Sequence, residues 1–310
     1  MVGSCSKINQ KQTQAANSKI IPNQQIPSKT AQKFFVDRAE SIEKTMGGRV
    51  AIDSPKLKGS ISLSGARIDD LVLPEYKATL AKDSSATILL SPSKYKNAYF
   101  AEFGWLSDTE IEIPNANTIW YADKKTLKAN DNITLSWQNS KGVIFNINIA
   151  LDSNYMFTIT QTVENQGSRA VSLGNYGLIN RVINKVDKSK IAYEGPIGVF
   201  NNVLKEVSYK DLESKKVSTF DNNFSGSWFG ISDKYWLTAI IPQNLEGKNF
   251  NSKFHYVNYM GKNKIQADYI SSTEIIQPGS KASRTINFFA GAKVLSILDN
   301  YEQKYNISLF

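Results

Sequence analysis

The fold is decided by residues 133–179, which read ITLSWQNSKGVIFNINIALDSNYMFTITQTVENQGSRAVSLGNYGLI. Apolar and polar side chains alternate along this stretch, first from Ile133 to Trp137 and again from Val143 to Ile149. A period of two is typical of β-strands that bury one face and leave the other in water. The stretch therefore predicts a meander of three successive hairpins. Its polar turns lie at residues 139–142, 152–154 and 165–168.

Strand patterns continue on the C-terminal side of this block. A hairpin turn is predicted at Met260-Gly261-Lys262-Asn263, and a second turn at Gln277-Pro278-Gly279 precedes the last predicted strand. No helical pattern alternates regularly with the strand patterns. The sequence therefore predicts an all-β fold, a large antiparallel sandwich of two facing sheets. The later predicted strands span residues 226–231, 236–241, 254–259, 264–270 and 281–290.

The chain divides into three segments. Residues 1–33 are rich in Gln, Asn, Ser and Lys and contain Pro22 and Pro27, which is typical of a flexible polar leader. Residues 34–292 carry the strand patterns and form the predicted β-sandwich domain. Residues 293–310 change to helical spacing, which predicts an amphipathic α-helix. No run of about 18 consecutive apolar residues occurs, so no membrane span is predicted.

The predicted C-terminal helix has one apolar stripe, and that face must be buried against something. The residues alone leave two alternatives open. Either the stripe packs on the chain's own sandwich, or it contacts a partner or a membrane surface. The candidate contact residues of the second alternative are Val294, Leu295, Ile297, Leu298, Tyr301 and Tyr305.

The charge of the chain is strongly basic. The formal net charge is +9 and the pI is near 9.3, which favours contact with an anionic surface. The lysines are spread over separate turn-like stretches, and neither an RNA-binding aromatic signature nor zinc-finger spacing occurs. We therefore predict no nucleic-acid partner and keep the anionic membrane surface as a candidate partner.

Residues that could carry catalysis are few. His255 is the only histidine and lies in a predicted strand, whereas Cys5 is the only cysteine and lies in the leader. A Cys/His pair is therefore not expected, and no nucleotide-binding glycine loop occurs. We predict no catalytic residue and no cofactor, and we interpret His255 as structural. A glycan-active enzyme, built on two carboxylates that folding brings together, stays an alternative.

A metal site would need oxygen ligands here, because zinc sites use several histidines or cysteines. The nearest candidates are Asp69-Asp70 and Asp221-Asn222-Asn223, and neither has the loop pattern of an EF-hand. We interpret both as ordinary turn residues and predict no metal site. The tryptophans could form a platform for sugars, but most lie in apolar strand-like stretches and are expected in the core. They are Trp105, Trp120, Trp137, Trp228 and Trp236.

A set of segments carries a family resemblance through its order along the chain. The segments are Arg67–Tyr76, Ser91-Pro92, Tyr99–Trp105, Val163–Gly167, Gly226–Ile231, Tyr235–Pro242, Gln277–Gly279 and Phe289–Gly291. Taken together they resemble the periplasmic domain of YidC-type membrane protein insertases. The resemblance covers roughly residues 45–310 and does not extend to the leader. No single segment is diagnostic by itself.

The resemblance implies a galactose-mutarotase-like β-supersandwich on the periplasmic side of the inner membrane. In the family this domain lies between the first and second transmembrane helices of a Gram-negative insertase. The implied role is a non-catalytic scaffold and interaction surface that assists the insertion and folding of inner-membrane proteins. The implied partners are the membrane core of the same insertase, the Sec translocon with its accessory subunits, and nascent inner-membrane proteins. The segment matching residues 293–305 leads toward the membrane core.

The epimerase-like shape calls for a check on catalysis. Those enzymes use histidines with a carboxylate for acid–base chemistry, and His255 alone cannot fill two imidazole roles. A shared shape supplies a cleft but no catalyst, so we predict that the chain is not an enzyme. A carbohydrate- or peptide-binding β-sandwich module stays the alternative function.

Overall fold

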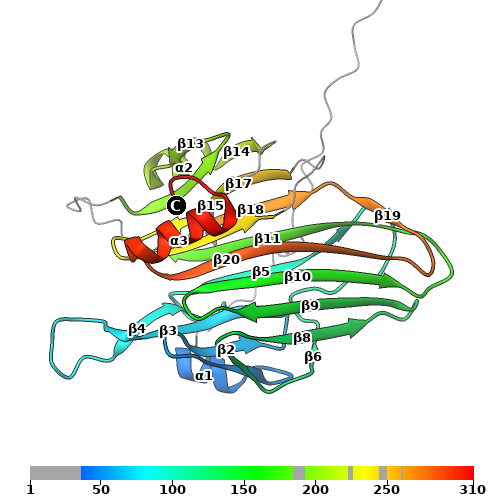
Figure 1. Cartoon of the computed structure of the whole chain (residues 1–310), viewed down its shortest axis with the longest axis horizontal. Helices are drawn as coiled ribbons and strands as arrows, with labels where there is room; N and C mark the ends of the chain where they lie inside the picture. The colour runs from blue at the N-terminus through cyan, green and yellow to red at the C-terminus, as the bar shows by residue number, and fades with distance from the viewer. Residues whose placement is uncertain (1–35, 184–192, 223–225, 244–249, 260) are drawn as a thin grey trace, which may run out of the picture.

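The computed structural model describes residues 36–183, 193–222, 226–243, 250–259 and 261–310 (Figure 1). The predicted leader, residues 1–33, lies outside the described residues. Two large sheets stack on one another, and almost all neighbouring strands within them run antiparallel, while β1 and β7 are parallel. The predicted all-β sandwich with a C-terminal helix is confirmed.

The larger sheet has 11 strands, in the order β14-β17-β18-β11-β5-β3-β2-β1-β7, with β4 beside β3 and β19 beside β11. Its strands are β1 (Arg49–Asp53), β2 (Lys58–Ser62), β3 (Arg67–Lys77), β4 (Ala86–Leu90), β5 (Tyr99–Ser107), β7 (Thr126–Lys128), β11 (Val171–Ile183), β14 (Val217–Asn222), β17 (Phe250–Tyr259), β18 (Lys262–Ser271) and β19 (Glu274–Ile276).

The smaller sheet has nine strands, in the order β13-β12-β15-β16-β20-β10-β9-β8-β6. The last strand of the chain, β20, thus lies between β16 and β10. The strands are β6 (Tyr121–Ala122), β8 (Asp131–Gln138), β9 (Val143–Leu151), β10 (Met156–Asn165), β12 (Gly195–Phe200), β13 (Val203–Glu206), β15 (Trp228–Ser232), β16 (Trp236–Pro242) and β20 (Lys281–Ala292).

The predicted meander is confirmed for its first three strands. β8, β9 and β10 pair in sequence, and their register aligns Ile133 with Ile149 and Ile149 with Ile159. Ile159 in turn faces Ile286 of β20, so one row of isoleucines crosses four strands on the buried face. Such a row is what alternation with a period of two produces when neighbouring strands share a core.

The third predicted hairpin is wrong. After the turn at residues 165–168 the chain leaves the smaller sheet, and β11 enters the larger one, where it pairs with β5 and β18. The side chain of Asn165 supports this crossing, since its amide donates to the carbonyl oxygens of Arg169 and Ile276. Alternation fixes which face of a strand is buried, but it does not say which strand lies next to it.

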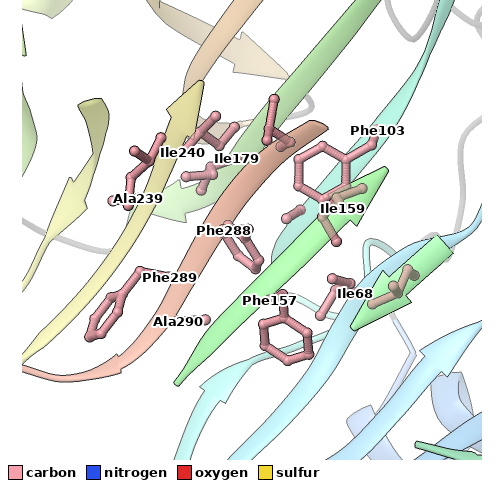
Figure 2. Close-up of a cluster of buried hydrophobic side chains, with 14 of the residues drawn as sticks. Ile68, Phe103, Phe157, Ile159, Ile179, Ala239, Ile240, Phe288, Phe289 and Ala290 are labelled. Atoms are coloured by element: carbon pink, nitrogen blue, oxygen red, sulfur yellow. The ribbon is translucent and has the colours of Figure 1, made fainter. Parts of the chain in front are cut away.

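The centre of the sandwich is aromatic and fully buried. The rings of Phe103 from the larger sheet and Phe288 from the smaller lie 5.8 Å apart, edge to face, and Phe157 lies beside Phe288 (Figure 2). Burying each such ring contributes about 1.5–3 kcal/mol. Figure 2 also shows Phe288 and Phe289 leaving β20 on different sides. Both faces of this part of β20 therefore carry large apolar side chains. The face that carries Phe289 must be covered by an element outside the space between the two sheets.

Two short helices were not predicted. In α1 (Arg38–Glu43) the Asp37 side chain accepts from the Ala39 amide, and in α2 (Tyr209–Lys215) the Ser208 side chain accepts from the Asp211 amide. Both are capped at the N-terminus in the usual way. They are too short for a helical period to stand out in the sequence. None of the helices in the described part of the chain is long and apolar enough to cross a membrane.

Candidate functional site at the C-terminal helix

The C-terminal helix α3 (Leu295–Tyr305) directly follows β20 and lies at the end of the sandwich opposite β19 (Figure 1). It begins after Val294, which makes no side-chain capping bond. It ends at Asn306, which has left-handed backbone angles and donates its amide to the Glu302 carbonyl. Asparagine tolerates this conformation better than most residues, which explains why the helix stops there.

The apolar stripe of α3 supplies the cover that β20 needs. Ile297, Leu298 and Tyr301 are buried, and the Tyr301 ring packs edge-on against Phe289. The Tyr301 hydroxyl donates to Asp152 Oδ2 at 2.6 Å and accepts from the Tyr155 amide at 3.3 Å. Burial raises the pKa of Tyr301, and the neighbouring Asp152 carboxylate raises it further. The hydroxyl therefore stays protonated and keeps its donor role.

The six predicted contact residues have different surroundings. Ile297, Leu298 and Tyr301 are buried in the sandwich, and Val294 and Tyr305 are half-buried against it. Leu295 is 76% exposed. The alternative in which the stripe packs on its own sandwich therefore describes most of the face. Contact with a partner or membrane core stays a prediction, and Leu295 is the residue of the six best placed to make it.

The residues after α3 fold back onto the sandwich. Phe310 packs edge-on against Trp228 and Phe289, and its amide donates to the Glu302 side chain. Trp228 Nε1 donates to the Ser308 carbonyl at 2.9 Å. The predicted helix over residues 293–310 is too long at its C-terminal end: α3 ends at Tyr305, and residues 306–310 follow contacts with distant parts of the chain rather than helical spacing. Together with the stripe, this segment fixes α3 at one orientation on the domain.

The bond between Tyr301 and Asp152 gives a direct test of how firmly α3 is attached. Tyr301→Phe is expected to lower the free energy of unfolding by about 1–2 kcal/mol, because the half-buried Asp152 carboxylate loses its donor. Urea unfolding followed by tryptophan fluorescence measures this. Tyr305→Phe is the matched control and is expected to change the value by less than about 0.5 kcal/mol. Equal effects of the two variants would contradict the assignment.

A mixed apolar and basic surface lies beside the start of α3, and we call it the α3 rim: Lys234, Tyr235, Trp236, Lys293 and Leu295. The Lys293 amide donates to the Tyr235 carbonyl at 2.9 Å, which joins the two parts of the rim. Tyr235 is 58% exposed, with Lys234 Nζ 4.8 Å from its ring centre. Trp236 is half-buried and packs edge-on against Tyr235. The rim thus combines exposed apolar side chains with two lysines.

His255 pairs with a buried carboxylate rather than with a nucleophile. Its Nε2 lies 2.9 Å from Asp268 Oδ2, and Gln266 donates to the same oxygen at 2.9 Å. The three residues lie on the adjacent strands β17 and β18, whose predicted hairpin is confirmed. This arrangement supports the structural interpretation of His255. Cys5 lies outside the described residues.

The interpretation of Asp69-Asp70 as turn residues is wrong. Both lie in β3 and are buried, Asp69 pairing with Arg49 and Asp70 with Arg38. The register between β2 and β3 shifts at Ser60, so Asp69 is an extra residue in a β-bulge. A bulge turns consecutive side chains away from strict alternation. The strand position of Asp69-Asp70 could not be predicted from the sequence, because a bulge interrupts the period-two alternation that identifies a strand.

The interpretation of Asp221-Asn222-Asn223 as turn residues is wrong for the first two residues. Asp221 and Asn222 end β14, and Asn223 lies outside the described residues. Within the described ranges, no group of three or more His, Cys, Asp or Glu residues could hold a metal ion. The expectation for the tryptophans is confirmed: Trp105, Trp120 and Trp228 are buried, while Trp137 and Trp236 are half-buried against the core.

Comparison with known proteins shows which family this chain is similar to. The family model of the YidC periplasmic domain matches residues 49–308. The chain is 43% identical over 270 residues to a membrane protein insertase YidC of Rickettsia bellii, covering 86% of this chain and 48% of that protein. It is 42% identical over 283 residues to the Rickettsia akari insertase, covering 90% of this chain and 50% of the relative. The chain thus spans about half the length of these relatives.

Among solved structures, a galactose mutarotase related enzyme from Lactobacillus acidophilus superposes with a TM-score of 0.53 at 10% identity, over 80% of this chain and 98% of that one. At this identity the likeness shows the fold alone, and it confirms the predicted mutarotase-like sandwich. The match of a family model to most of the described sandwich, together with relatives above 40% identity, decides the family. The chain belongs to the YidC periplasmic domain family of membrane protein insertases.

Proposed function

We propose that this chain is a non-catalytic domain on the periplasmic side of the inner membrane, where it acts as a scaffold during insertion and folding of membrane proteins. Family membership supports the location and the class of process. We propose that the insertion step itself belongs to the half of the relatives that this chain does not span. The domain then contributes by position and by contact, which makes its surface the functional part.

The α3 rim is the contact surface in this proposal. One observation carries it: the apolar stripe of α3 is occupied by the sandwich, while Leu295 and Tyr235 stay exposed next to Lys234 and Lys293. Aromatic and aliphatic side chains beside lysines suit the boundary between a membrane and water. We propose that the rim faces the membrane core of the same insertase at the bilayer surface. Sec translocon subunits and nascent inner-membrane proteins are further proposed partners.

Leu295→Glu separates contact from stability. The exposed position should leave the free energy of unfolding within about 0.5 kcal/mol of the unchanged chain. In the full-length insertase, the same change is expected to weaken the contact roughly tenfold, which corresponds to about 1.4 kcal/mol. Membrane insertion of a dependent substrate in cells measures the effect. Tyr121→Glu, at an equally exposed site on β6, is the matched control and should have no effect.

Site-specific photocrosslinking in native membranes tests the contact directly. A photoreactive residue at position 295 or 235 of the full-length insertase is expected to crosslink to its membrane core or to Sec subunits. The same residue at position 121 is expected to give no such product. Equal yields at all three positions would show that the rim has no special contact and would remove it from the proposal.

The non-catalytic part of the proposal rests on the single histidine. Acid–base chemistry of the epimerase kind needs two imidazole roles, and His255 is engaged with Asp268. The carbohydrate- or peptide-binding alternative stays a prediction. Binding to glycan and peptide arrays would favour it over the scaffold.

A further inference from the structure

A small pocket with a mixed polar and apolar lining lies between the two sheets at the end of the sandwich opposite α3. Its volume is about 10 Å³, and its lining includes Trp105, Gln161, Asn175, Glu274 and Arg284. The register explains this gathering. Trp105 faces Asn175 across β5 and β11 in one sheet, and Gln161 faces Arg284 across β10 and β20 in the other. Two cross-strand pairs thus meet in the interior.

Three polar atoms in the lining lack a hydrogen-bond partner among the described residues. They are Gln161 Oε1, Asn175 Nδ2 and Arg284 Nε. Gln161 is 1% exposed and Asn175 is 5% exposed, so bulk water does not reach them freely. Leaving buried polar atoms unpaired is unfavourable, and native proteins rarely do so. Three such atoms in the lining of one pocket indicate a bound molecule that forms a hydrogen bond with each of them.

The orientation of the Gln161 amide is fixed by a neighbour. Its Nε2 donates to the Gly104 carbonyl at 2.7 Å, so reversing the amide would bring two oxygens together. The oxygen of Gln161 is therefore an acceptor within the pocket lining. Asn175 Nδ2 and Arg284 Nε are donors by their chemistry. A molecule bound in the pocket must therefore accept two hydrogen bonds and donate one.

We propose that the pocket binds one water molecule as a fixed part of the fold. The water accepts from Asn175 and Arg284 and donates to Gln161, which is the usual number of bonds for a buried water. It joins the larger sheet, through Asn175, to the smaller sheet. The volume admits about one water, which excludes a sugar or a peptide side chain.

An anion does not fit this pocket. The charge of Arg284 is already engaged by Glu274, whose Oε1 lies 3.3 Å from Nη2. A second anion would meet both that carboxylate and the Gln161 oxygen. Glu274 and Arg284 are also partly exposed members of the lining, with side-chain exposures of 30% and 17%. Exchange with solvent would therefore proceed past this ion pair.

A high-resolution crystal structure of the 310-residue chain tests the proposal. The expected result is one compact density peak at hydrogen-bond distance, about 2.7–3.2 Å, from all three atoms. A second measurement does not depend on the crystal: the Asn175 side-chain amide should show a nuclear Overhauser effect to a long-lived water. A well-ordered but empty pocket, side chains turned to bond one another, or density larger than a water would overturn the proposal.

A variant gives the matched control. Asn175→Leu removes one donor and fills the space, so both the density peak and the water signal are expected to disappear while circular dichroism shows a folded chain. Should this variant fail to fold, Arg284→Lys keeps the charge opposite Glu274 and removes Nε. There the expected result is a peak that has lost its third contact. An unchanged peak in the folded variants would contradict the assigned bonds.

Discussion

Gly230→Ala is expected to prevent folding of the domain. Gly230 lies in the centre of β15, and a Cβ atom built on it would lie 1.8 Å from the Thr238 carbonyl oxygen and 2.7 Å from Ala239 Cα on β16. The obstacle is backbone on a buried neighbouring strand, so no flexible side chain can move aside. The strands would have to separate. We therefore expect the free energy of unfolding to fall by at least about 4 kcal/mol, which is at the upper end of the effects of single substitutions.

Circular dichroism and urea unfolding measure this loss. Gly279→Ala is the control, because Gly279 lies in an exposed turn with a φ of 76° and has no atom within 4 Å of a built Cβ. The control substitution is expected to lower the free energy of unfolding by about 1 kcal/mol, because only the left-handed backbone conformation disfavours alanine there. If both variants unfolded at the same urea concentration, close approach of the strands would not be the reason for glycine at position 230.

Arg49→Met is expected to have the second largest effect, lowering the free energy of unfolding by about 3–5 kcal/mol. The Arg49 guanidinium pairs with Asp69, and both side chains are almost completely buried, at 10% and 6% exposure. Removing the cation leaves a buried carboxylate without its counter-charge, which is more costly than losing the pair as a whole. The double variant Arg49→Met with Asp69→Leu should therefore be more stable than Arg49→Met alone.

The effect of Arg49→Met should also depend on pH. Burial raises the pKa of Asp69, although Arg49 acts in the opposite direction. The folded chain therefore holds this proton more tightly than the unfolded chain, and the contribution of Asp69 to stability falls as pH rises through the raised pKa. Without Arg49 the pKa rises further, so the damage should shrink as the solution is acidified toward about pH 4. A penalty that stays constant from pH 7 to pH 4 would contradict this account.

The sequence predicted the parts of the fold that depend on local alternation. Ile133, Ile149 and Ile159 share a face in the sequence pattern, and the register of β8, β9 and β10 confirms it. It did not predict that β11 changes sheets, because that choice depends on contacts with β5 and β18, which are distant in the chain. It misplaced Asp69-Asp70 because a bulge interrupts the period at that point.

The candidate surface was predicted in part for the same reason. Helical spacing identified the stripe of α3, but spacing cannot show that the sandwich itself covers Leu298 and Tyr301. Tyr235 joins Leu295 in the rim only through pairing between residues far apart in sequence. The small pocket did have a signal in the sequence: Gln161 stands at an inward position in the alternation of β10, between Ile159 and Val163. A polar residue in such a position indicates a buried hydrogen-bond partner.

The central place of β20 has a consequence for how the chain reaches its native state. Both β10 and β16 need this final strand as a neighbour, so during synthesis they present open backbone edges until residues 281–292 have emerged. Neither half of the nine-stranded sheet can close earlier. Pairings between such remote segments form slowly, and exposed edges attract other chains. The order of strands therefore leaves two sheet edges unpaired until the end of the domain has been made, and we expect incomplete chains to aggregate more readily than the finished domain.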